Sequence, residues 1–229
     1  MATPDIVDFR SAVVGGAGAQ NVEVDVATLG IRDTDLVLAL VSWRDQTEID
    51  TDEAGWTELE YVQQGFGPSM GIYERRGGGG NDAFGFTKNT GPARVCAAIA
   101  RVPNAEVEAS DIDTGTSTTP TAPDAEAGGS ANRLILRAWS RPFIDSLADF
   151  PPDGYTSEWN IASGGAAGGH VDQTAASAAV AASGSVGEES ITIGASRNWC
   201  AATIILRSLA ASPTDLWGYL WAVERAHAL

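Results

Sequence analysis

The sequence states the same short pattern twice. An apolar run at 36–40 precedes the triplet Gly55-Trp56-Thr57, and a second apolar run at 134–138 precedes Gly154-Tyr155-Thr156. The runs begin 98 positions apart, and the triplets begin 99 positions apart. Landmarks in one order at nearly constant spacing indicate a tandem duplication. A duplicated, strand-rich unit without a catalytic motif favours a scaffold that binds or builds over an enzyme.

Each copy also closes on a Cys-Ala-Ala segment, at 96–98 and at 200–202. Cys96 and Cys200 therefore occupy matching places. One interpretation is a disulfide bridge between equivalent strands. The other is a pair of small buried residues that descend from one ancestral position. The flanking alanines and an expected cytoplasmic origin favour buried free thiols.

The length and patterning predict an all-β fold. Residues 21–26 alternate apolar and polar, as in a half-buried strand, and 36–43 form an apolar run of strand length. The 229 residues are 44% hydrophobic, enough for one large β domain. We expect residues 1–209 to form an antiparallel β-sandwich. Its related halves cover about 20–102 and 133–209, and the Thr- and Pro-rich segment 103–132 connects them.

The last twenty residues, 210–229, differ in kind. Ser212-Pro213-Thr214-Asp215 provides a capping hydroxyl, a proline for the first turn and an acid near the helix N-terminus. These signals predict a short C-terminal α-helix. One of its faces is apolar and consists of Leu216, Trp217, Leu220 and Trp221. Such a face must be buried, either on this sandwich or against a neighbouring subunit.

Charge and hydropathy limit the classes of partner that the protein can bind. The formal net charge is −16, so phosphate repulsion disfavours nucleic acid as a partner. The acidity fits either a salty environment or a GC-rich genome. No apolar stretch is long enough to span a membrane, and the N-terminal residues lack the pattern of a signal peptide. We therefore expect synthesis in the cytoplasm and no membrane contact.

Few residues suggest chemistry. An acidic segment at 45–53 offers Asp45, Asp50 and Asp52 as calcium ligands, but it lacks the glycine and terminal glutamate of an EF-hand loop. A solvated acidic loop is the simpler interpretation, and no cofactor is expected. Neither His170 nor His227 accompanies a nucleophile elbow. The sequence therefore predicts a protein that is not an enzyme.

The aromatic residues of the two triplets allow two interpretations. Exposed Trp56 and Tyr155 side chains would stack on sugar rings and make a glycan-binding module. Duplicated aromatics also mark the core of each half, where the fold needs volume.

The first copy resembles a recurrent pattern in structural proteins of tailed phages. The resemblance rests on the strand at 35–40, the Gly-Trp-Thr segment at 54–59, the Tyr-containing segment at 71–74 and the strand at 94–102 that closes in Arg-Val. The segment 114–123 looks like the usual bridge to a second copy. The second copy departs from the pattern, with Tyr155 in place of tryptophan and 168–172 in place of the tyrosine strand.

The resemblance implies a jelly-roll-like sandwich in minor tail, fibre or head-decoration proteins, which are usually symmetric oligomers. It implies no catalytic residues. We therefore expect a non-enzymatic virion protein that contacts other copies of itself and other virion proteins, with Leu216, Trp217, Leu220 and Trp221 as the anchor. The alternative is a carbohydrate-binding or receptor-binding module that contacts a cell-surface glycan through Trp56 and Tyr155.

Overall fold

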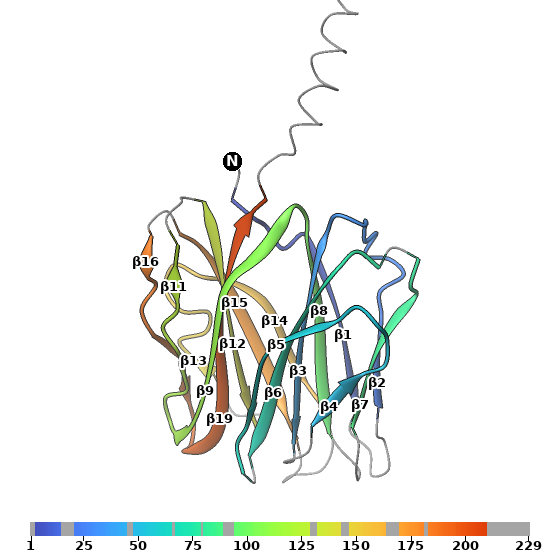
Figure 1. Ribbon diagram of the computed structural model, residues 1–229. Coiled ribbons are helices and arrows are strands. Elements are labelled where there is room, and N and C mark those ends of the chain that lie inside the picture. Colours follow the sequence, from blue (N-terminus) through green and yellow to red (C-terminus); the bar gives the residue numbers. More distant parts are fainter. Residues whose placement is uncertain are drawn as a thin grey trace, which may run out of the picture.

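The computed structural model describes residues 3–14, 21–44, 48–65, 67–78, 80–88, 94–128, 132–142, 147–163, 170–180 and 183–209. These residues form an all-β protein of antiparallel sheets (Figure 1). The strands of the first half are β1 (Asp8–Val14), β2 (Asn21–Asp25), β3 (Leu36–Arg44), β4 (Ile49–Thr51), β5 (Thr57–Gln63), β6 (Pro68–Arg76), β7 (Ala83–Lys88) and β8 (Val95–Val102).

The second half contains four long strands and several short ones. The long strands are β9 (Ala105–Ser117), β12 (Arg133–Arg141), β15 (Asp172–Val180) and β19 (Arg197–Ser208), with β14 (Thr156–Ala162) at the sheet edge. The short strands are β10 (Thr121–Ala122), β11 (Glu126–Ala127), β13 (Leu147–Ala148), β16 (Gly184–Ser185), β17 (Glu189–Ser190) and β18 (Thr192–Ile193).

Both halves have the same topology. The large sheet of the first half has the order β1-β8-β3-β6-β5, and that of the second half has the order β9-β19-β12-β15-β14. The first half adds the small sheet β2-β7-β4, and the second half adds the pairs β10-β17, β11-β16 and β13-β18 in corresponding places. This strand order is that of a jelly roll in which β5 extends the sheet beyond β6 in the first half and β14 extends it beyond β15 in the second. The predicted sandwich of two related halves is confirmed, and each half is a jelly roll of its own.

Register matches the two copies residue by residue. Leu38 of β3 lies between Ala100 and Glu74, and Leu136 of β12 lies between Ile204 and Ser177. We call residues in such matching places counterparts. Gly55 and Gly154, which precede β5 and β14, both adopt a positive φ. Each of these strands then carries one bulged residue, Leu59 or Glu158, so the duplication extends to local irregularities.

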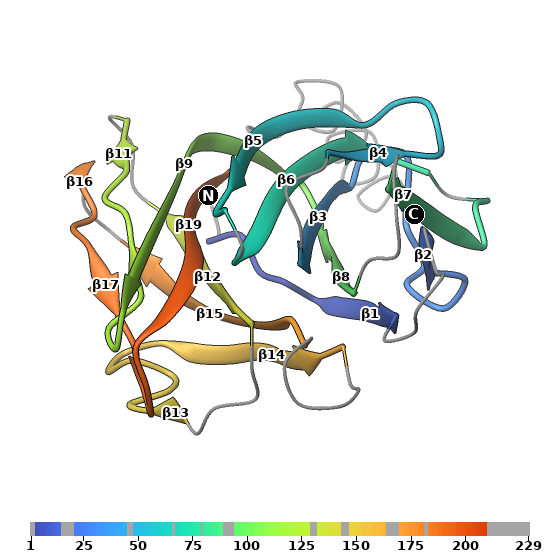
Figure 2. The ribbon, with the colours of Figure 1, turned by 90° about the horizontal axis from the view of Figure 1, so that it is seen from below.

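Alternation along β3 and β12 divides the interior into layers. Leu36, Leu38 and Leu40 pack in one cluster with Leu134 and Leu136, where the two large sheets face each other. The intervening side chains face the small strands of their own half, as Val37, Val41 and Trp43 do in the first. Figure 2 shows the two large sheets at the centre and the small strands outside them. The central cluster makes the two jelly rolls one body.

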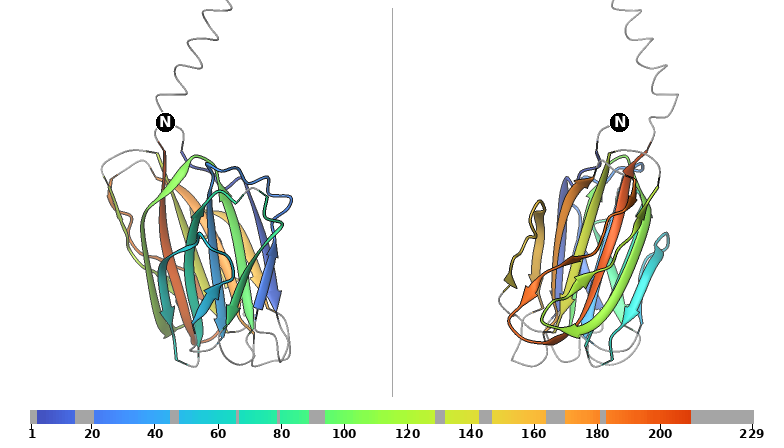
Figure 3. Two further views of the ribbon diagram at one scale, coloured as in Figure 1. Left: turned by 45° about the vertical axis from the view of Figure 1, so that its right-hand side comes forward. Right: turned by 90° about the vertical axis from the view of Figure 1, so that its left-hand side faces the viewer.

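The edges of the two large sheets meet at two seams. β9 lies beside β5, and β1 lies beside β14 (Figure 2). At the first seam Ser110 donates to Glu60 at 3.2 Å, and at the second the rings of Phe9 and Trp159 lie 5.6 Å apart. The N-terminal segment and the end of β19 lie at the same end of the molecule (Figure 3).

Three expectations need correction. The segment 103–132 is not a connector without a core, because it supplies β9 to the second large sheet and β10 and β11 to the outer layer. The first half likewise begins before residue 20, with β1. The counterpart of the tyrosine strand is also not 168–172. It is β15, whose Ala176 holds the place of Tyr73.

Candidate functional site

Trp56 closes one end of the first jelly roll. Its ring is half-buried and packs edge-on against Phe84, with the ring centroids 5.2 Å apart and an interplanar angle of 82°. The guanidinium carbon of Arg75 lies 5.4 Å from the Trp56 centroid and 4.6 Å from that of Phe84. The Nε and Nη1 atoms of Arg75 are buried and have no hydrogen-bond acceptor among the described residues. The aromatic rings are therefore the main electrostatic partners of this cation.

Tyr155 occupies the counterpart position in the second half. Its ring is half-buried beside the cluster that contains Trp139, and the guanidinium carbon of Arg137 lies 5.7 Å from its centroid. Burial raises the pKa of the Tyr155 hydroxyl, and the nearby charge of Arg137 partly opposes this rise. Arg137 is buried and donates to the carbonyl oxygen of Gly187 at 2.7 Å.

The two halves build this cation–aromatic pair from different strands. Arg75 lies on β6, where its counterpart is Ala178, and Arg137 lies on β12, where its counterpart is Ala39. The same contact therefore does not follow from simple inheritance of one arginine. In both halves the aromatic side chain is half-buried and packs against an arginine, which favours a structural role over that of a free stacking platform for sugars.

The acidic segment is tied to the small sheet. Asp50 lies in β4 opposite Thr87, and the main-chain nitrogen of Asp52 donates to the carbonyl oxygen of Gly85 at 3.0 Å. The Glu53 carboxylate accepts a hydrogen bond from the Gly85 nitrogen, also at 3.0 Å. Asp45 lies outside the described residues. Within the described ranges, no three His, Cys, Asp or Glu side chains gather as ligands for a metal ion.

Both cysteines are free and buried. The Cys96 thiol donates to the carbonyl oxygen of Val171 at 2.9 Å, and the Cys200 thiol donates to that of Pro68 at 3.0 Å. Burial raises the pKa of both thiols far above the ordinary value. The expectation of two buried free thiols is therefore confirmed. A protonated, enclosed thiol is also a poor nucleophile.

The remaining candidates from the sequence are the C-terminal apolar residues and the two histidines. Leu216, Trp217, Leu220, Trp221 and His227 lie outside the described residues. His170 is buried at the start of the segment that leads into β15.

A buried polar network between the halves escaped the sequence analysis. Trp159 donates through Nε1 to Oε1 of Gln173 at 2.9 Å. Gln173 in turn donates through Nε2 to the Ser42 hydroxyl at 2.8 Å and to the Leu40 carbonyl oxygen at 3.2 Å. The network therefore ties β14 and β15 of one half to β3 of the other. No periodicity reveals it, because it depends on contacts across the central layer.

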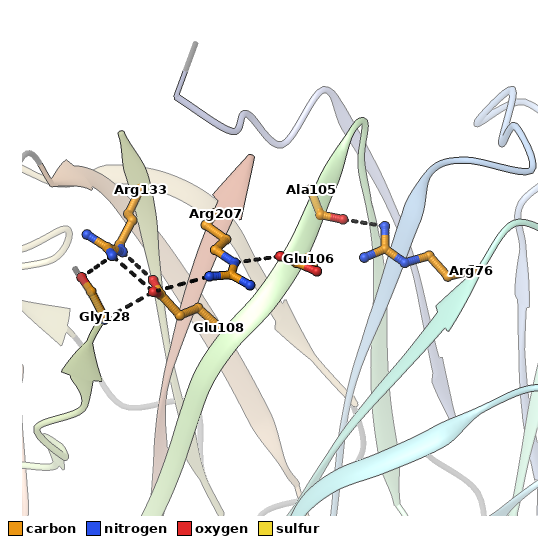
Figure 4. Close-up of polar contacts among 7 residues, drawn as sticks. All are labelled: Arg76, Ala105, Glu106, Glu108, Gly128, Arg133 and Arg207. Atoms are coloured by element: carbon orange, nitrogen blue, oxygen red, sulfur yellow. Dashed lines mark hydrogen bonds and ion pairs between the residues drawn. The ribbon is translucent and has the colours of Figure 1, made fainter. Parts of the chain in front are cut away.

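A row of buried arginines was also missed. Arg133, Arg137 and Arg141 occur at every fourth position of β12, so they share the face toward the small strands. Arg133 forms an ion pair with Glu108, the bulged residue of β9 (Figure 4). The hydrogen bonds from Arg133 are the main cause that lowers the pKa of the Glu108 carboxyl. The four-residue spacing of arginine in an apolar run was the available signal.

One groove opens beside the second seam. Its volume is about 460 Å³, and it lies between the N-terminal segment and the neighbouring ends of β14 and β15. Its lining includes Pro4, Asp5, Leu134, Glu158, Ser177 and Ala179. Asp5 and Glu158 give this groove two carboxylates, and the described lining contains no cation.

Among the described residues, no helix has the length and apolar character needed to cross a membrane. Comparison of the chain with protein-family models, curated proteins and solved structures gave no match.

Proposed function

We propose that this protein is a non-enzymatic structural subunit of a virion, such as a head-decoration, spike or tail accessory protein of a tailed phage or related particle. The observation that carries the proposal is the pair of jelly rolls packed through their large sheets around one central cluster. Jelly rolls are a common architecture of capsid proteins, although lectins and cupins share it. The resemblance of the first copy to tailed-phage structural proteins favours the capsid-type use.

The distribution of polar groups supports an assembly role. Side chains that would otherwise serve a small ligand are engaged inside the fold. Trp56 and Tyr155 pack against arginines, and Glu53 holds the main chain of β7. The function then depends on outer surfaces and on the terminal segment. The net charge of −16 limits nonspecific association between copies.

The C-terminal segment is the proposed anchor. Leu216, Trp217, Leu220 and Trp221 would provide large apolar side chains of the kind that dominate binding energy at interfaces. The last described residue, Leu209, is tied to the turn that joins β8 to β9, because its nitrogen donates to the Asn104 carbonyl oxygen at 2.8 Å. The proposed anchor follows directly on Leu209 in the sequence.

Truncation tests the proposal. The full chain and a chain ending at Ala211 would each be expressed in a culture that produces the particles, and purified particles would be probed for each protein by gold labelling and electron microscopy. We expect labelled particles with the full chain and a strong loss of label after truncation, with an unchanged melting temperature. Absence of the full chain from purified particles would overturn the proposal. Full incorporation of the truncated chain would overturn the anchor.

A further inference from the structure

The groove beside the second seam has a matching place at the first seam, and the two places differ in their charged residues. Leu36 lies opposite Arg76 in the register of β3 and β6, and Leu134 lies opposite Ala179 in the register of β12 and β15. Where the first half places an arginine side chain, the second half has a methyl group. The groove therefore opens at a position that an arginine side chain occupies in the other copy.

The arginine of the first half shows what suits this position. Arg76 donates through Nη1 to the carbonyl oxygen of Ala105, at the start of β9 (Figure 4). The counterpart of Ala105 is Pro4, because each lies four residues before a matching position, Ala109 on β9 or Asp8 on β1. Both residues are buried. Pro4 lines the groove. A guanidinium bound in the groove would thus lie beside the main chain of the N-terminal segment, as Arg76 lies beside β9.

A second cation is also missing from the second seam. The counterpart of Asp5 is Glu106, whose carboxylate accepts a hydrogen bond from Arg207 at 2.5 Å (Figure 4). The counterpart of Arg207 is Pro103, by the register of β8 and β19 against their neighbours. Asp5 therefore keeps the negative charge of its counterpart without the adjacent arginine.

Glu158 adds a further negative charge. It is the bulged residue of β14, where the first half has the apolar Leu59. The Ser177 hydroxyl donates to one of its carboxylate oxygens. Burial raises the pKa of Glu158, and the charge of Asp5 raises it further. Compared with the matching place at the first seam, the groove lacks two arginines and has one more carboxylate.

We propose that this groove binds the guanidinium group of an arginine side chain presented by a partner polypeptide. A guanidinium forms a planar fork that donates two parallel hydrogen bonds to one carboxylate, and it is more weakly hydrated than an ammonium group. Glu158 and Asp5 supply the acceptors, and Pro4, Leu134 and Ala178 supply apolar surface for the aliphatic stem. The volume of about 460 Å³ admits a whole side chain with its main chain. This binding does not depend on the assembly role proposed above.

The probe is N-acetyl-arginine methylamide, and the neutral citrulline analogue is its isosteric control. Titration of the full chain would be followed through the backbone amide signals of Gly154, Thr156 and Ser177 in nitrogen–proton correlation spectra. We expect saturable shifts with the arginine compound and none with the citrulline compound. Equal shifts with both compounds, or no shifts with either, would overturn the proposal.

Ala179→Arg is the most specific variant, because it restores the arginine of the first half within the chain. We expect it to weaken binding of the probe at least about tenfold, which corresponds to roughly 1.4 kcal/mol. Ala148→Arg adds the same charge at an exposed position of β13 and should leave binding unchanged.

Glu158→Leu copies Leu59 and provides a second test if Ala179→Arg fails to fold. It should also weaken binding at least about tenfold and should keep the melting temperature of the parent. Retained binding in a folded Ala179→Arg or Glu158→Leu protein would contradict the assignment.

Discussion

Cys96 and Cys200 join the two halves by the same contact made in opposite directions. Cys96 of the first half donates to Val171 of the second, and Cys200 of the second half donates to Pro68 of the first. Val171 and Pro68 are themselves counterparts. Val171 directly precedes β15, which pairs with β12, and Pro68 begins β6, which pairs with β3. The duplication therefore extends to the contacts between the copies.

The thiols should be unreactive in the folded protein. Both are buried, and burial raises their pKa, so little thiolate is present at neutral pH. We expect a chromogenic disulfide reagent to label neither cysteine in native buffer and both in denaturant. Rapid labelling of either residue in native buffer would show that the central layer opens readily.

Replacement of Gln173 by methionine should destabilise the protein. Met70 is the counterpart of Gln173, so the side chain fits the fold, but the change leaves the indole N–H of Trp159 without its acceptor. Loss of a buried acceptor costs about 1–3 kcal/mol. Chemical denaturation would measure the change in the free energy of unfolding.

Gln63→Met at an exposed position of β5 is the matched control for this change, and it should alter the free energy of unfolding by less than about 0.5 kcal/mol. A cost for Gln173→Met as small as that of the control would mean that the network does not hold the halves.

The Glu108–Arg133 ion pair should make stability depend on pH. The pKa of Glu108 is lowered in the folded protein, so its contribution is complete above the unfolded value of about 4.3 and is lost as pH falls through the folded pKa. Glu108→Gln should cost about 3–5 kcal/mol at pH 7, because it leaves the buried charge of Arg133 without its partner. The difference from the parent in thermal unfolding should shrink below about pH 4.

Glu106→Gln provides the comparison, since the arginine that Glu106 contacts is about half exposed, at 47%. This variant should cost at most about 1 kcal/mol at pH 7. Equal costs for the two variants, or a cost of Glu108→Gln that stays constant to pH 3, would exclude a dominant role for the buried pair.

Arg75→Met should weaken the closure of the first jelly roll. Methionine keeps much of the volume but removes the cation that lies over Trp56 and Phe84. The expected loss is about 0.5–2 kcal/mol, with a change in tryptophan fluorescence that reports the new surroundings of Trp56. If fluorescence and stability both stay at the parent values, the arginine does not stabilise the turn.

The sequence predicted the parts of the fold whose side chains carry a strong pattern. The apolar runs became β3, β8, β12 and β19, and each Gly-aromatic-Thr triplet leads from a positive-φ glycine into a strand, β5 or β14. In these segments the local preference and the tertiary packing agree, so the pattern alone was sufficient.

The missed elements lack such a pattern. β9 alternates acids with small residues and lies half-buried at a sheet edge, so it appeared to be a linker. β15 consists largely of alanine and other small residues, which have a low preference for strands, yet the large sheet holds it between β12 and β14.

The groove could not be predicted either, because it depends on Ala179 being the counterpart of Arg76. That correspondence follows only from strand register, and the sequence assigned the tyrosine strand to 168–172.

The two jelly rolls share one interior and should therefore unfold together. Differential scanning calorimetry of the parent, Leu38→Ala and Leu136→Ala tests this coupling, because these fully buried counterparts lie in different halves but in one cluster. We predict a single transition in all three proteins, shifted by similar amounts in the two variants, for a loss of about 2–5 kcal/mol each. Two separate transitions, with each variant lowering only one of them, would show that the halves unfold independently and do not share one interior.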